Sequence, residues 1–185
     1  MPDAGSPARA AASHSYFFAL RPGAADAARI YAFASALLAM RGISGRRIAP
    51  ERLHVTLAWL GQELDAAALT RACNAAGSLH QAALELHFDA AMSFAAPSGP
   101  FVLLGDSGLE AVHALHAALA AALATAGFVL AQDYIPHLTL SYDPRHRAAR
   151  ETIEPIGFRA TEFVLVKSHI GLSRHEVLLR WPLRG

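Results

Sequence analysis

The sequence has 185 residues, 54% of them hydrophobic and 17% charged, with a formal net charge of +1. This balance excludes a disordered chain, and charges or Gly and Pro interrupt every apolar run before the ~18 residues that a membrane helix needs. One cysteine, Cys73, excludes an internal disulfide and a multi-cysteine metal site. We therefore expect a soluble, cytoplasmic monomer without a membrane partner, built as one domain or as two small lobes that share a core.

The charged residues are unevenly distributed along the chain. Residues 1–52 carry seven arginines against three acidic residues, residues 53–144 carry one arginine against eight, and residues 145–185 carry eight basic residues against four. A protein that wraps duplex nucleic acid is normally basic overall, and this one is not. Two basic segments that flank an acidic one are compatible with convergence on a small anionic ligand, and equally with ordinary surface charge.

The N-terminal third of the chain predicts a leader, two strands and a helix. Residues 1–13 contain no leucine-rich segment, so they predict a disordered leader and no signal peptide. Residues 14–21 are aromatic and precede a Pro-Gly pair, which predicts a strand. Residues 24–41 carry apolar side chains at helical spacing and predict a helix. A second strand is expected over residues 52–60.

The middle of the chain predicts two strands between two helices. Residues 65–79 predict a helix with Asp65 as its N-cap. Residues 84–95 and 100–105 predict two strands around a turn rich in Pro and Gly. A long helix is expected from a cap at Ser107 to Ala126, with leucines along one face and a glycine directly after it.

Three more strands are expected toward the C-terminus, over residues 134–142, 159–167 and 175–181. Helices that lie between groups of strands are typical of an α+β fold. No linker divides residues 14–185, so we expect these residues to form a single domain.

Two of the predicted strands carry the same pattern of a histidine, an aliphatic residue, a threonine, a leucine, a small residue and an aromatic residue. The two copies are His54-Val55-Thr56-Leu57-Ala58-Trp59 and His137-Leu138-Thr139-Leu140-Ser141-Tyr142. Because side chains alternate between the faces of a strand, each histidine is expected to share a face with its threonine. The aliphatic and aromatic residues, including Trp59 and Tyr142, are then expected to pack into the core. One such motif is a weak signal, whereas two matched copies indicate a functional pair.

Two imidazoles and two hydroxyls suit the cleavage of a phosphodiester. A histidine pKa near 6.5 lets one imidazole accept a proton while the other donates one at neutral pH. In-line displacement at phosphorus needs both a base for the entering oxygen and an acid for the leaving oxygen. The threonine hydroxyls can hydrogen-bond the non-bridging oxygens as charge grows on them. No metal or other cofactor is then required.

At these two motifs the sequence resembles the 2H phosphoesterase superfamily, and within it the bacterial RNA 2′,3′-cyclic phosphodiesterases that are also called 2′-5′ RNA ligases. The resemblance extends over nearly the whole chain after the leader. It implies two similar lobes with antiparallel sheets about a pseudo-twofold axis, with one motif strand from each lobe lining a central cleft. It also implies that His54 and His137 are catalytic and that Thr56 and Thr139 bind the substrate.

The activity implied by the resemblance is the opening of a 2′,3′-cyclic phosphate, at an RNA end or in a nucleotide, to a 2′-phosphate. We assign His54 as the general acid for the departing 3′ oxygen and His137 as the base that acts on water. The reverse joining of RNA ends through a 2′-5′ bond is expected to be weak, because the opening of a strained cyclic phosphate is downhill in water.

One position departs from the family pattern. Many bacterial relatives have an arginine five residues after the second histidine, where it helps to hold the phosphate, and here that position is Tyr142. A phenol donates one hydrogen bond but brings no charge. Tyr142 is therefore expected to contact the substrate while a basic residue supplies the missing charge. The candidates for that residue are Arg47, Lys167, Arg145 and Arg174.

Two other functions are open at this point. The same four motif residues would serve a 2H phosphoesterase that acts on a small cyclic nucleotide or on a 2′-5′-linked oligoadenylate. Alternatively, the two histidines are buried structural residues of a non-catalytic RNA-binding module. A metal site at His113 and His116 is disfavoured, because no carboxylates accompany them and solvated helix histidines explain them better.

Overall fold

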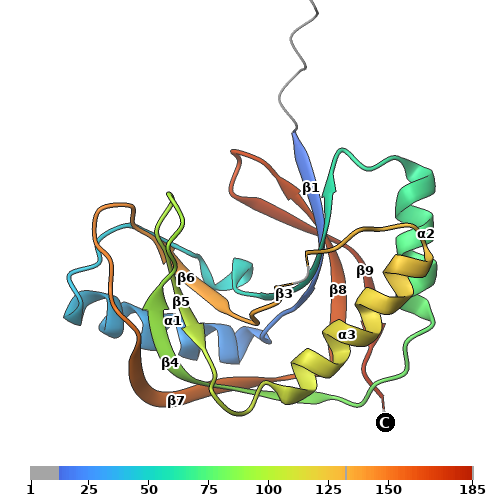
Figure 1. Cartoon of the computed structure of the whole chain (residues 1–185). Helices are drawn as coiled ribbons and strands as arrows, with labels where there is room; N and C mark the ends of the chain where they lie inside the picture. Colours follow the sequence, from blue (N-terminus) through green and yellow to red (C-terminus); the bar gives the residue numbers. More distant parts are fainter. Residues whose placement is uncertain (1–12, 132, 185) are drawn as a thin grey trace, which may run out of the picture.

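The computed structural model describes residues 13–131 and 133–184, so the predicted leader, apart from Ser13, lies outside the described residues. Helices and strands follow one another in an α+β arrangement (Figure 1). In chain order they are β1 (His14–Leu20), α1 (Ala24–Met40), β2 (Arg46–Arg47), a 3₁₀ turn (Pro50–Arg52), β3 (Val55–Gln62), α2 (Ala66–Gly77), β4 (Leu84–Ser93), β5 (Pro100–Leu104), α3 (Glu110–Thr125), β6 (Leu138–Tyr142), β7 (Glu151–Ala160), β8 (Glu162–His169) and β9 (Arg174–Pro182). Within the described ranges, none of the helices is both long and apolar enough to span a bilayer.

The strands form an antiparallel sheet with the order β7-β4-β5-β6-β3-β1-β8-β9, and β2 pairs with β6. Its two halves meet where β3 pairs with β6, at Val55 and Leu138. Figure 1 shows the halves as two lobes, with α1 beside β4 to β7 and with α2 and α3 beside β1, β8 and β9. The predicted α+β fold with two antiparallel lobes is confirmed.

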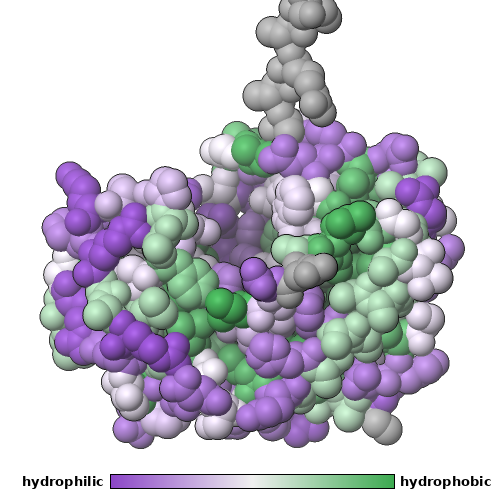
Figure 2. Space-filling view, in the orientation of Figure 1, coloured by the Kyte–Doolittle hydropathy of each residue, from purple (hydrophilic) through white to green (hydrophobic). Residues whose placement is uncertain are grey.

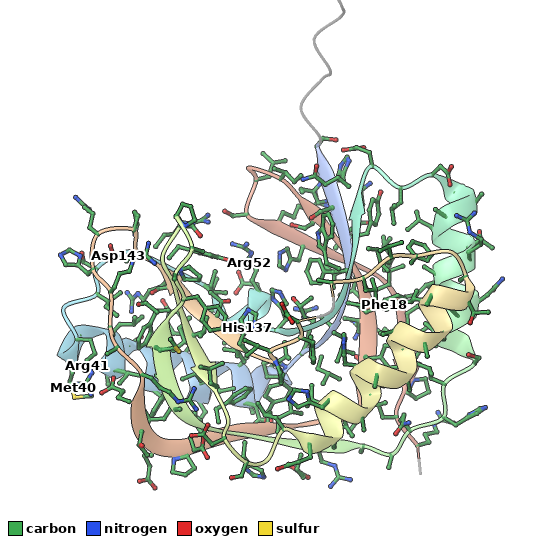
Figure 3. All side chains as sticks on the ribbon, in the orientation of Figure 1. Phe18, Met40, Arg41, Arg52, His137 and Asp143 are labelled. Atoms are coloured by element: carbon green, nitrogen blue, oxygen red, sulfur yellow. The ribbon has the colours of Figure 1, made fainter. Side chains whose placement is uncertain are left out.

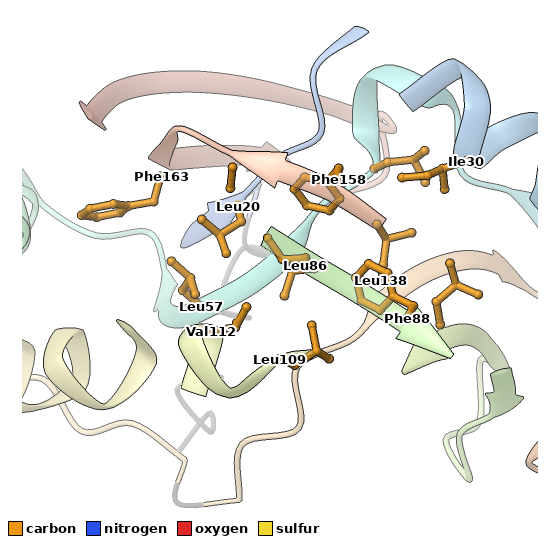
Figure 4. Close-up of a cluster of buried hydrophobic side chains, with 14 of the residues drawn as sticks. Leu20, Ile30, Leu57, Leu86, Phe88, Leu109, Val112, Leu138, Phe158 and Phe163 are labelled. Carbon is orange, nitrogen blue, oxygen red and sulfur yellow. The ribbon is translucent and has the colours of Figure 1, made fainter. Parts of the chain in front are cut away.

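One hydrophobic core runs through both lobes, so the halves of the sheet are held together from within. Helix α3 packs against this core with one apolar face, as predicted, and Figure 4 shows Val112 of that face among the buried side chains. The residues of that face are Val112, Leu115, Leu119 and Leu123, all completely buried. Complete burial of such a side chain stabilises the fold by about 1.5–3 kcal/mol.

The two predicted helix caps have different outcomes. Asp65 caps α2 as predicted, because its carboxylate accepts a hydrogen bond of 2.7 Å from the backbone N–H of Ala68. The prediction that Ser107 caps α3 is wrong, since the residue that precedes the first turn of that helix is Leu109, two positions later. The Ser107 hydroxyl instead donates to Asp89, whose carboxylate also holds the loop before the helix.

Strand β7 is not predicted from the sequence. The single strand expected over residues 159–167 instead covers the last residues of β7 and most of β8, which are two separate strands. Pro and Gly at positions 155 and 157 argue against a strand. Pro155 is accommodated because it lies in a bulge between the paired residues of β7 and β4. Gly157 is required, because a Cβ there would lie 1.8 Å from the carbonyl oxygen of Leu86 on β4.

Candidate active site

The pairing of β3 with β6 brings the two repeated motifs together at the centre of the molecule. Both motif strands begin later than predicted, so each histidine lies directly before its strand. Val55 pairs with Leu138, and the neighbours of this pair point to the opposite face. The histidine of each motif therefore lies beside the threonine of the other. These cross-strand neighbours are His54 with Thr139, and His137 with Thr56, and all four are partly exposed.

A β-bulge in each motif strand changes which side chains share the face of the histidines. The pairing of β3 with β1 skips Leu57, and the pairing of β6 with β5 skips Leu140. One extra residue shifts the alternation of side chains by one position. Trp59 is consequently 56% exposed, and its predicted core packing is wrong. Tyr142, at the equivalent position of the second motif, is half-buried and lines a cavity on the same face.

Two adjoining cavities border the motif residues. The cavity beside His54 has a volume of about 270 Å³ and also contains Thr139 and Tyr142 in its wall. The cavity beside His137 has a volume of about 440 Å³ and a mostly apolar lining. Thr56 and Trp59 line both cavities, so the two spaces meet at the motif face. Figure 2 shows the surface hollowed between the lobes, with hydrophilic residues in its depth.

The two histidines are oriented in the same way by the main chain. Nδ1 of His54 lies 2.7 Å from the carbonyl oxygen of Arg52, and Nδ1 of His137 lies 2.7 Å from that of Ile135. A carbonyl oxygen only accepts hydrogen bonds, so Nδ1 carries the proton and donates it in both rings. Nε2 of each imidazole is therefore the nitrogen that can exchange a proton with a bound molecule.

Burial favours the neutral form of both imidazoles. It lowers the pKa of His54 to about 4, opposed by the hydrogen bond to the main chain and helped by His137 and by the positive charges of Arg21 and Arg52. Burial also lowers the pKa of His137. In the ligand-free protein at pH 7, each Nε2 therefore offers a lone pair. A phosphate anion at the site would favour the charged form and raise both pKa values.

Three residues outside the predicted set of site residues lie at His54. The ring of Phe17 stacks on its imidazole at a centroid distance of 5.0 Å, and the ring of His175 meets it edge-on at 5.3 Å. Burial, followed by the charges of His54 and the nearby arginines, lowers the pKa of His175 to about 3. Arg52 lines the same cavity. Phe17 lies on β1 and His175 on β9. The order of the strands in the sheet places these rings beside His54, and no local sequence pattern predicts that order.

The basic residues predicted to hold the phosphate lie elsewhere. Arg47 donates to the Ser35 hydroxyl at 2.9 Å and lies over the ring of Tyr31, so its side chain is directed toward α1. Lys167 on β8 precedes Ser168, which lines the cavity, so alternation places the lysine on the other face. Arg47, Lys167, Arg145 and Arg174 are absent from the walls of these two cavities of the described chain.

The helix histidines considered for a metal have a different environment from the one predicted. His113 is exposed, but His116 is partly buried, with Nδ1 2.7 Å from the carbonyl oxygen of Leu57. Its ring stacks on Tyr134 at 3.6 Å, so the expectation of a solvated His116 is wrong. Residues 13–131 and 133–184 contain no group of three His, Cys, Asp or Glu side chains placed to hold a metal ion.

Comparisons with known proteins show which family model and which solved structures this chain is similar to. A family model described as the 2′-5′ RNA ligase superfamily matches residues 25–171. A crystal structure described as a phosphoesterase has a TM-score of 0.76 and 25% identity, over 94% of this chain and 99% of that one. LigT of E. coli, crystallised with 3′-AMP, has a TM-score of 0.75 and 26% identity over the same shares.

Two further comparisons concern a more distant solved structure and the curated proteins. The protein TT0787 of Thermus thermophilus has a TM-score of 0.73 and 19% identity, over 92% of this chain and 98% of that one, which shows a shared fold. Among curated proteins, no significant match is found.

Proposed function

Because the chain belongs to the 2′-5′ RNA ligase superfamily, whose structural relatives include a phosphoesterase, we propose that it opens 2′,3′-cyclic phosphates at RNA ends to 2′-phosphates without a metal. The observation that carries this proposal is the matched pair of histidines. Each has its Nδ1 proton held by the main chain, and each lies beside a threonine at the joint of the two lobes. Two imidazoles whose Nε2 atoms can exchange protons would supply the base and the acid of an in-line displacement.

The reaction needs one proton accepted and one donated. Nε2 of His137 removes a proton from water as the water oxygen bonds to phosphorus. The bond from phosphorus to the 3′ oxygen breaks, and Nε2 of His54 gives that oxygen its proton, so the phosphate stays on the 2′ oxygen. The hydroxyls of Thr56 and Thr139 donate to the non-bridging oxygens as their charge grows. The phosphate anion raises the pKa of His54 from about 4, which favours the charged imidazole that this step uses.

The shape of the site favours a nucleotide over a smaller phosphodiester. The cavity beside His137 is walled by aromatic and aliphatic side chains, including Trp59, Phe94 and Tyr134. Aromatic faces stack on nucleobases, each stack contributing about 1–3 kcal/mol. In a relative of 26% identity, E. coli LigT, a crystal structure contains 3′-AMP, a nucleoside with a phosphate at the position where ring opening breaks the bond.

A free nucleoside 2′,3′-cyclic phosphate is a second candidate substrate. The two adjoining cavities, of about 270 and 440 Å³, have room for one phosphate and one base. The same catalytic groups would act on either substrate, so only their relative turnover separates the two candidates.

The test compares an RNA that ends in a 2′,3′-cyclic phosphate with a nucleoside 2′,3′-cyclic phosphate, with EDTA present. His54→Ala and His137→Ala are expected to lose at least about 10²-fold in kcat, since each lacks one proton-transfer group. His80→Ala, which alters a loop histidine outside both cavities, serves as the control and should keep wild-type activity. Chromatography against both phosphate isomers should identify the 2′-phosphate. Full activity in either folded site variant would contradict the proposal.

A further inference from the structure

Arg52 is a cationic residue with an unsatisfied donor at the cavity of His54. It ends the 3₁₀ turn that precedes β3 and lines the cavity of about 270 Å³ together with Thr139 and Tyr142. Figure 3 shows it between the two lobes, in the same region as His137. Its Nε is buried and has no hydrogen-bond partner among the described residues. A buried donor without an acceptor is unfavourable, so its position beside a cavity points to an acceptor that a ligand brings.

Among the described residues, no arginine other than Arg52 has a buried side-chain nitrogen without a hydrogen-bond partner. Several other arginines form ion pairs with carboxylates at the surface: Arg29 with Asp26, Arg41 with Glu151, Arg150 with Asp106, Arg159 with Glu85 and Arg180 with Glu162. Arg52 has no such pair within residues 13–131 and 133–184. The nearby carboxylate of Glu51 raises the pKa of Arg52 but forms no ion pair with it, so the guanidinium can act on a bound molecule.

Two further arginines add positive charge near the cavity of Arg52. Burial, and then the guanidinium of Arg46, lower the pKa of Arg52 from its usual value. Arg46 lies over the ring of Tyr142 at 5.9 Å, and Arg21 is close enough to lower the pKa of His54. These three arginines all come from the basic N-terminal segment. Of the three, Arg52 lines the cavity, and the other two lie near it.

We propose that Arg52 binds the phosphate of the substrate and takes over the charge that the family places at the position of Tyr142. The Nε and one terminal nitrogen of a guanidinium donate two parallel hydrogen bonds to two phosphate oxygens. The hydroxyls of Tyr142 and Thr139 line the same cavity and add neutral donors. The inference rests on the proposed function for the nature of the substrate, but not for the presence of an anion site.

The first experiment measures the binding of inorganic phosphate by isothermal titration calorimetry, which requires no turnover. Arg52→Met keeps much of the aliphatic stem, and we expect it to weaken phosphate binding by about tenfold or more, the loss of one charge-assisted pair of hydrogen bonds. Arg52→Lys keeps a charge without the two parallel donors and should be weakened as well. Arg159→Met, on the outer strand β7, is the matched control and should bind as the wild type does.

The second experiment uses activity and chemical rescue. Arg52→Met should lose about 10²-fold in kcat/KM for a nucleoside 2′,3′-cyclic phosphate, the size of a lost transition-state donor. Addition of guanidinium ion to Arg52→Ala should restore part of the activity, which a purely structural arginine would not allow. The melting temperature of ligand-free Arg52→Met should not fall, because no protein partner is lost at Nε.

The outcomes separate this assignment from the proposed function. Wild-type phosphate affinity in Arg52→Met, or the absence of phosphate binding by the wild type, would overturn the assignment of Arg52. If the wild type binds phosphate through Arg52 but hydrolyses neither cyclic phosphate, the anion site stands and the proposed function fails.

Discussion

The two motifs of the site have the same backbone arrangement but differ in the side chains that surround them. In each, the histidine donates Nδ1–H to the carbonyl two residues before it, a bulge follows the threonine, and an aromatic residue reaches the same face. Around His54 lie Phe17, His175 and Arg52, and the arginine makes this end of the site cationic. Around His137 lie the edge of Phe94, at 4.9 Å, and an apolar cavity.

This difference separates two tasks. In the proposed reaction, the two motifs supply one proton-transfer group each, a base and an acid. The cationic surroundings of His54 suit the phosphate, and the apolar cavity beside His137 suits the base of the nucleotide. On this proposal, the similarity of the motifs serves the proton transfers, and the difference between their surroundings serves the binding of the substrate.

The largest effect is expected for substitution of the two histidines, and a substrate whose leaving group needs no proton should distinguish their roles. His54→Ala and His137→Ala should each lose ~10²–10⁴-fold in kcat on the natural cyclic phosphate. A substrate with sulfur in place of the 3′ oxygen has a leaving group that needs no proton. On this substrate His54→Ala should recover and His137→Ala should not, as measured by steady-state release of thiol. Recovery of His137→Ala instead would reverse the assignment of acid and base.

Thr56 and Thr139 should contribute equally to kcat if their role follows from the backbone arrangement that the two motifs have in common. Thr56→Val and Thr139→Val keep the shape of the side chain and remove the hydroxyl, so each should lower kcat about 10²-fold. The two losses should agree within roughly tenfold in the same assay, the spread seen for single transition-state donors. Thr125→Val, at the exposed end of α3, is the control and should leave kcat unchanged. Losses that differ by much more would show that the motifs are not functionally equivalent.

The stability of the ligand-free protein should depend on pH through His54. Its pKa is about 4 in the folded protein and near 6.5 when unfolded, so the unfolded chain binds more protons between these values. The free energy of unfolding should therefore be highest above about pH 6.5 and fall by roughly 3 kcal/mol on acidification to pH 4. Urea unfolding of His54→Gln should show a smaller loss than that of the control His80→Gln. Equal losses would mean that His54 is not held neutral by burial.

The smallest effect is expected for substitution of Trp59, which lines both the cavity beside His54 and the cavity beside His137. Trp59→Ala should raise KM for adenosine 2′,3′-cyclic phosphate about tenfold with little change in kcat, because a base stack contributes about 1–3 kcal/mol. Trp59→Phe keeps an aromatic face and should lie close to the wild type. Glycerol 1,2-cyclic phosphate has no base, so its KM should not change. Equal losses on both substrates would place Trp59 in the catalytic geometry and not in base binding.

Much of the fold can be predicted from local sequence, because apolar spacing and turn residues mark most helices and strands. Strand β7 cannot, since its Pro155 and Gly157 are acceptable only through a bulge and a close approach to β4. The repeated motif identifies the two histidines and two threonines, which the structure brings together. The exposure of Trp59 follows from a bulge that depends on pairing with β1, and no pattern within β3 specifies it. Arg52 lacks a motif of its own, so its significance depends on the cavity beside it.

The hydrogen bonds that fix the two imidazoles come from main-chain carbonyls, which every amino acid possesses. The side chains at positions 52 and 135 can therefore change over evolution without altering which ring nitrogen is free. One of these positions holds an arginine and the other an isoleucine, although both perform the same service for their histidine. A protein with this arrangement can acquire new substrates by substitution next to the reacting groups while its acid and base chemistry is preserved.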